Sequence, residues 1–104
     1  MILSTTDNIP GREILEILDI ARGSTVRARN VGRDIFAGLK NLIGGEITEY
    51  TQLMSDAREQ ALDRMVADAE DLGADAVINV RFMTAMVMQG ASEILAYGTA
   101  VKLK

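Results

Sequence analysis

One long amphipathic segment constrains the fold of this chain more than any other feature. Between about residues 48 and 72, apolar residues recur at helical spacing and form a single stripe, with charged residues around it. The stripe consists of Met54, Ala57, Ala61, Met65, Ala69 and Leu72. Thr48 suits the N-cap position, and Gly73 is typical of a helix end. The pattern predicts a long helix whose apolar face must pack against another element.

Residues 13–29, near the N-terminus, are predicted to be extended. They follow a turn signal in which Pro10 restricts the backbone and Gly11 adds flexibility. Their apolar residues do not alternate cleanly between two faces, so the pattern indicates no single buried side. Gly23 and Ser24 in the middle of the segment suggest a bulge or a hairpin turn.

Two further segments complete the predicted fold. Apolar spacing over residues 35–43 predicts a short helix that ends at two adjacent glycines. Residues 74–104 are rich in Val, Ile, Tyr and Thr, and predict two strands joined through residues 89–91. The order of elements favours an α+β, two-layer fold, in which the long helix lies across one face of a small antiparallel sheet. With 104 residues, the chain has the size of one domain.

Both faces of the predicted C-terminal hairpin are apolar. Simple alternation places Ile78, Val80 and Phe82 on one side of its first strand. Val77 and Met83 then fall on the other side. One long helix can cover only one of these faces. The uncovered face predicts self-association, because large apolar patches on small soluble domains usually mark interfaces. The alternative is burial under the N-terminal strands and the short helix.

The composition excludes several classes of function. The chain has no Cys and no His, so it has no thiolate nucleophile, no imidazole base and neither the thiolate nor the imidazole ligands that heavy metals prefer. No nucleophile and base can be paired, so we predict neither an enzyme nor a cofactor. No segment resembles a membrane span or a secretion signal, and we expect a cytoplasmic protein that does not contact a membrane.

Charge is unevenly distributed along the chain, whose net charge is −4. Residues 22–40 carry a net charge of +4, whereas residues 46–75 carry −7. An acidic chain repels nucleic acid, so no nucleic-acid partner is expected. The basic segment has two interpretations. Either Arg27, Arg29 and Arg33 converge on an anionic ligand, or they pair with the acidic helix within or between subunits.

The stretch IGGEITEYT, at residues 43–51, holds another candidate site. It lacks the spacing of a phosphate loop or a dinucleotide turn, and its glutamates would repel a phosphate. Gly44 and Gly45 are therefore interpreted as the hinge between the two helices, with at least one of them at positive φ. The alternative is a hard-cation site built on Glu46 and Glu49, which would need carboxylates from several subunits.

Three closely spaced methionines are a further metal candidate. Thioethers suit copper(I), and Met83, Met86 and Met88 lie in one predicted strand. Ordinary packing is the alternative and the commoner role of such residues.

The chain resembles the YbjQ family of small bacterial and archaeal proteins over essentially its whole length. The resemblance rests on the stretches NVGRDIFAGLKNLIGGEITEYT, AREQALDRMVADAEDLGADAVINVRF and AYGTAV. Its most specific parts are Gly44-Gly45-Glu46 with Tyr50, the helix exit Leu72-Gly73-Ala74 that runs into a strand through Arg81 and Phe82, and residues 96–100.

The resemblance implies a dodecin-like β-α-β-β subunit, assembled as a homopentamer in which extra short strands link neighbours. It would make residues 1–104 a single domain. The family carries a heavy-metal-binding label that transfers poorly to a chain without thiolate or imidazole. We therefore expect a structural or small-ligand-binding homo-oligomer, with oxygen-ligand metal binding around Glu46 as the alternative. The candidate ligand-binding residues are Arg27, Arg29, Arg33, Gly44, Gly45, Glu46 and Tyr50.

Overall fold

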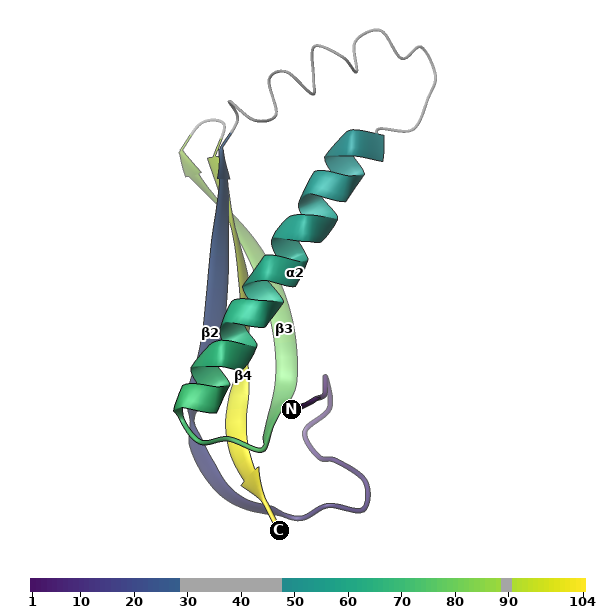
Figure 1. The fold of residues 1–104 in the computed structure, drawn as a ribbon, viewed down its shortest axis with the longest axis vertical. Coiled ribbons are helices and arrows are strands. Elements are labelled where there is room, and N and C mark those ends of the chain that lie inside the picture. The colour runs from purple at the N-terminus through teal and green to yellow at the C-terminus, as the bar shows by residue number, and fades with distance from the viewer. Residues whose placement is uncertain (29–47, 89–90) are drawn as a thin grey trace, which may run out of the picture.

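One long helix lies across one face of a four-stranded sheet (Figure 1). The computed structural model describes residues 1–28, 48–88 and 91–104. The described elements are β1 (Ile2–Leu3), β2 (Ile14–Ala28), α2 (Thr48–Asp71), β3 (Ala76–Met88) and β4 (Ala91–Leu103). The predicted α+β class, long helix and C-terminal strand pair are confirmed. The short helix predicted over residues 35–43 lies outside the described residues.

The strands lie in the order β1-β3-β4-β2. β4 is central and pairs antiparallel with both β3 and β2. β1 pairs parallel with β3, where Ile2 lies opposite Ala76 and Leu3 opposite Val77. The sheet is therefore mixed, and the prediction of a purely antiparallel sheet was wrong. The two residues of β1 are far from β3 in sequence, so no tight hairpin turn forces them to run antiparallel.

Helix α2 ends where its glycine signal predicted. Gly73 has a φ of 79°, and its N–H donates to the carbonyl of Glu70 at 2.9 Å. The next amide, of Ala74, donates to the carbonyl of Ala69 at 3.0 Å. These bonds satisfy carbonyl groups that would otherwise have no partner at the helix end. The chain then turns directly into β3.

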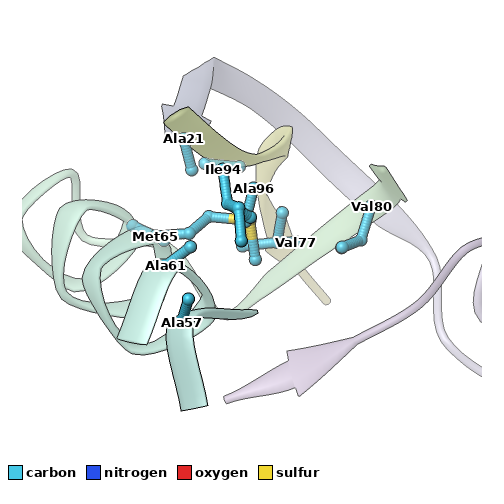
Figure 2. Close-up of a cluster of buried hydrophobic side chains, with 10 residues drawn as sticks. Ala21, Ala57, Ala61, Met65, Val77, Val80, Ile94 and Ala96 are labelled. Atoms are coloured by element: carbon cyan, nitrogen blue, oxygen red, sulfur yellow. The ribbon is translucent and has the colours of Figure 1, made fainter. Parts of the chain in front are cut away.

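The core between helix and sheet is built from alanines and Met65 on α2 and from alanine, valine and isoleucine on the strands (Figure 2). Its buried members are Ala21, Ala57, Ala61, Met65, Ala69, Val77, Val80, Ile94, Ala96 and Ala100. Gly23 takes part in this close packing, because a β-carbon on it would overlap the backbone of Ala61 and Met65.

The bulge or turn predicted at Gly23 and Ser24 is not present. These residues stay in register opposite Ala96 and Leu95, within one continuous strand. The glycine is needed for the approach of the helix backbone rather than for a change of chain direction. The register shifts of β2 lie nearer its start, between Ile14 and Glu16 and between Ile17 and Asp19, and they explain its imperfect alternation.

A bulge in β3 also corrects the predicted faces of the hairpin. The register with β4 shifts between Ile78 and Arg81, where Asn79 adopts a φ of 53°. One extra residue reverses the alternation. Val80 therefore packs in the helix-side core with Val77, and not on the side of Ile78 as simple alternation predicted.

The N-terminal segment covers part of the sheet face away from α2. A second buried cluster there contains Ala76, Ile78, Val101 and Leu103, with Ile9 and Ile14 packed against it. The predicted turn at Pro10 is confirmed, since the N–H of Arg12 donates to the carbonyl of Ile9 at 3.0 Å. The expected alternative of burial under N-terminal residues thus applies to one end of this face.

Candidate functional site

The rest of the sheet face away from α2 stays uncovered in the described part of the chain, and we call it the open face. Ile17 is 68% exposed, and Ile20 and Val26 on the same strand are also exposed. Met83 of β3 is 52% exposed, and it lies opposite Leu95 on the face away from the helix. The predicted uncovered apolar face is therefore present.

The outer half of β3 is exposed on both of its faces. Residues 81–86 are all exposed, and the stretch from Phe82 to Met86 contains no charged residue. Phe82 and Met86 lie on the helix side of the sheet, opposite Ala96 and Ser92, and they are 47% and 77% exposed. An apolar strand that is exposed on both faces is rare in a protein that stays monomeric.

The backbone of β2 along the sheet edge is bonded by side chains of α2. The N–H of Arg22 donates to Oδ2 of Asp68 at 3.0 Å. One turn earlier on the helix, Nη1 of Arg64 donates to the carbonyl of Ser24 at 2.5 Å. The N–H of Ile20 is bonded to the side chain of Asp19 at 2.7 Å. The backbone of this edge is therefore bonded at three successive outward positions.

The other edge, along β3, is bonded only in its first half. Beside β1, the N–H of Ser4 donates to the carbonyl of Val77, and the N–H of Val80 donates to the carbonyl of Ser4, both at 3.0 Å. The guanidinium of Arg81 then donates to the carbonyl of Thr5 at 2.8 Å. Beyond Arg81, no described segment other than β4 bonds the backbone of β3.

The register identifies which backbone groups of β3 point outward. In an antiparallel pair, the N–H and C=O groups of successive residues point alternately toward the partner and away from it. The N–H of Arg22 points away from β4, because it donates to Asp68 of the helix. The backbone N–H and C=O of Tyr97, which lies opposite Arg22, therefore point toward β3 and bond the backbone of Arg81. The residues of β3 whose backbone groups then face outward are Phe82, Thr84 and Met86.

Most residues predicted to bind a ligand lie outside the described part of the chain. Arg27 belongs to β2 and lies opposite Ser92, and Tyr50 belongs to the first turn of α2, but the positions of both side chains lie outside the description. The others fall within residues 29–47, and they are Arg29, Arg33, Gly44, Gly45 and Glu46. The predicted anion site, hinge and oxygen-ligand metal site therefore remain predictions.

The described residues contain no cluster of three or more acidic side chains that could hold a metal ion. The copper(I) candidate is also weakened, because Met83 and Met86 lie on opposite faces of β3. Two thioethers on opposite faces cannot bind one ion within a single chain. The side chain of Met88 lies outside the description.

The predicted pairing of Arg27, Arg29 and Arg33 with the acidic helix lies outside the described side chains and stays a prediction, but another residue of the basic segment is described. Arg22 contacts the acidic helix through its backbone N–H, which binds Asp68. An exposed ion pair joins Lys104 and Glu13, with 3.9 Å between Nζ and Oε2. None of the described helices is long and apolar enough to cross a membrane.

Sequence reasoning missed the roles of Arg64 and Asp68, because it placed charged residues around the helix stripe without assigning these two any partner. Their separation of four residues places them on the same side of α2. That spacing occurs on many helices, and the sequence contains no signal that this side runs along the edge of β2. Only the packing of Gly23 against the helix backbone identifies it.

Comparisons with known proteins agree over the full length of the chain. A family model named YbjQ and described as "Putative heavy-metal-binding" matches residues 1–104. A "UPF0145 protein" from Methanosarcina acetivorans is 61% identical over 99% of this chain and 97% of its own length. A "UPF0145 protein" from Archaeoglobus fulgidus is 59% identical over 100% of this chain and 96% of its own length.

A crystal structure has a similar fold. It is that of a protein of unknown function from Pediococcus pentosaceus, assigned to the DUF74 family. The TM-score is 0.66, with 15% sequence identity, and the match covers 100% of this chain and 98% of the other. At this low identity the similarity concerns the fold alone.

Proposed function

This chain belongs to the YbjQ family. We propose that it acts in the cytoplasm as a homo-oligomeric ring, a pentamer, with a structural or small-ligand-binding role. The observation that carries the proposal is the open face, with its exposed Ile17, Ile20 and Met83. No reaction is proposed, because the chain lacks a thiolate or imidazole and offers no nucleophile paired with a base.

Burial of apolar surface supports assembly. Each exposed aliphatic side chain that becomes buried contributes about 1.5–3 kcal/mol, so a few such residues per interface suffice to hold subunits together. A ring is the simplest closed assembly for a contact between two different surfaces, because every copy then uses both of them. The five-fold order is the expectation that the family resemblance supplies.

A row of polar residues on the open face supports a small anionic ligand. Tyr97 of β4 lies opposite Arg22 on one side and Arg81 on the other. All three side chains belong to the face away from α2, since their neighbours Ala21 and Ala96 pack in the helix-side core. Guanidinium groups bind carboxylates and phosphates well, so an anion at this row is the ligand class that we propose.

The mass of the protein in solution tests the assembly. We expect light scattering at micromolar concentrations to give about five times the chain mass of 11.3 kDa. A monomer over this range would overturn the proposal, and a stable dimer would overturn the ring.

A thermal-shift screen of anionic metabolites, repeated with Arg22→Gln, tests the ligand. The melting temperature should rise for an anion in the native chain and not in the variant.

Metal binding by oxygen ligands around Glu46 is the second candidate, favoured by the family description and not by any described geometry. One carboxylate per chain is too few for a hard cation, so the site would need copies of Glu46 from several subunits. Calorimetry with calcium, magnesium, manganese and zinc tests this. Binding that is unchanged in Glu46→Gln would exclude that residue, whereas its loss would favour this candidate.

A further inference from the structure

We infer that the anionic ligand carries two anionic groups joined by an apolar middle, and that it lies across three strands from Arg22 to Arg81 with its middle over Tyr97. These three residues are called the arginine row below. The inference rests on the proposed ligand-binding role. It adds the class of molecule, which is a dicarboxylate or another dianion with separated charges, rather than a molecule with one anionic group.

The arginine row runs straight across β2, β4 and β3. Tyr97 lies opposite Arg22 on one side and opposite Arg81 on the other. Neighbouring strands are about 4.8 Å apart, so the Cα atoms of the two arginines are separated by about 10 Å. One carboxylate is much shorter than this distance, so it reaches both guanidinium groups only if both side chains bend inward over Tyr97.

Arg81 is held on the side of β3 that faces away from Tyr97. Its Nη1 donates to the carbonyl of Thr5 at 2.8 Å and to that of Val80 at 2.9 Å. The N-terminal segment that contains Thr5 runs beside β3 on the side opposite β4, where β1 also pairs. The guanidinium of Arg81 would have to leave Thr5 in order to bend toward Tyr97. Two separate anionic groups therefore fit the row better than one shared group.

Both guanidinium groups keep N–H donors for a ligand. Arg22 donates its backbone N–H to Asp68, but its exposed side chain has no hydrogen bond or ion pair within the described ranges. In Arg81, Nη2 and Nε are without a described partner. A guanidinium binds a carboxylate through two parallel N–H donors. Each arginine can therefore hold one end of a dianion.

The surface between the two arginines suits an apolar middle. Tyr97 is partly exposed, and its ring offers a flat apolar surface on which an aromatic or aliphatic group can pack. The adjacent rows of the open face contain no charged residue. They are Ser24, Leu95 and Met83 on one side, and Ile20, Thr99 and Ile78 on the other. No carboxylate in these rows competes with a ligand for the guanidinium groups.

Three aromatic acids test the separation of the two charges. Terephthalate carries carboxylates at opposite ends of a flat ring, phthalate carries both side by side, and benzoate carries one. In calorimetry at fixed ionic strength, terephthalate should bind about 10-fold or more tightly than either of the others, because its two contacts are linked. Phthalate has the same charge as terephthalate, so it controls for electrostatic attraction alone.

Arg22→Gln tests whether the second anionic group binds at this row. The side chain of Arg22 has no described partner, so the variant should fold as the native chain does. It should bind terephthalate about as weakly as the native chain binds benzoate, a loss of about 10-fold or more. Arg58→Gln makes the same change of charge at an exposed position of α2 and should keep the native affinity.

Arg81→Gln should remove the same preference for terephthalate. The melting temperature of this variant without a ligand reports separately on the lost bond to Thr5. Equal affinities for the three acids, all lost in Arg22→Gln, would overturn the inference and leave a site for a single anion. A preference for terephthalate that persists in both variants would also overturn it. Absence of binding by all three acids would overturn the inference and the proposed anionic ligand together.

Discussion

The two long edges of this sheet differ in what completes their backbone hydrogen bonds. Along β2, the helix supplies side chains that bond Arg22 and Ser24. Along β3, the N-terminal segment supplies bonds only as far as Arg81, and the following residues face outward without a described partner. A single helix can lie beside only one edge of a sheet, and its placement over β2 decides which edge is open (Figure 1).

The largest expected effect comes from Gly23→Val, which breaks the contact that places the helix beside β2. The added side chain would overlap the backbone of Ala61 and Met65, and neither the strand nor the helix can move without disturbing the core. We expect a loss of roughly 3 kcal/mol or more in the free energy of unfolding, measured by urea denaturation. An unchanged midpoint would mean that α2 is not held against β2 at this position.

A smaller effect is expected from Asp68→Ala, which removes one bond from the closed edge. The N–H of Arg22 loses its carboxylate acceptor but stays accessible to water, so the free energy of unfolding should fall by about 1 kcal/mol. Asp63→Ala, on an exposed part of the same helix, is the control and should change stability by less than about 0.5 kcal/mol. Equal losses in the two variants would remove the special role of Asp68.

Thr25→Val is expected to raise the free energy of unfolding, whereas the two preceding substitutions lower it. Thr25 lies on the helix side of β2, is only 3% exposed, and its Oγ1 has no hydrogen-bond partner within the described chain. Valine has the same shape without the buried hydroxyl, so stability should rise by roughly 0.5–1 kcal/mol. Thr25→Ser, which keeps the hydroxyl and loses a methyl, should be less stable than the native chain. A destabilised valine variant would show that the hydroxyl is bonded.

The smallest effect on the stability of the subunit is expected for Met86→Lys, in the outer half of β3. Met86 is 77% exposed, so the change should alter the free energy of unfolding by less than about 0.5 kcal/mol. Association should nevertheless weaken, because an edge lysine opposes strand pairing. Urea denaturation of the dissociated chain and light scattering of the concentrated chain separate these outcomes. A large loss of subunit stability would place Met86 in the core.

The helix and the hairpin were predictable because their signals are local. Periodic alanines and methionines identify α2, and Gly73 ends it where expected. Two apolar segments rich in Val, Ile, Tyr and Thr identify β3 and β4. The faces of β3 were not predictable, because the bulge at Asn79 is one residue that reverses all later positions. The role of Gly23 was misread, since a glycine in a strand indicates a bulge as readily as a close approach.

The candidate ligand-binding residues have a different status. Arg29, Arg33 and Glu46 lie outside the described residues, so the anion site and the metal site remain predictions from sequence and resemblance. The open face was predicted because the hairpin has two apolar faces and the chain has one long helix to cover them. The exposed side chains of Ile17 and Met83 confirm it. The pair that closes the edge of β2 had no sequence signal.

The amino-acid sequence by itself determined the long helix and the C-terminal hairpin. It also determined that the hairpin is apolar on both faces, whereas one long helix can cover only one of them. These features follow from residue periodicity and local backbone preferences, and both act over a few neighbours. Only the tertiary structure decided which edge of the sheet is closed, because that depends on where the helix lies across the strands. A contact between Arg64 and Ser24, forty residues apart, exists only once the core around Gly23 has placed the helix against β2.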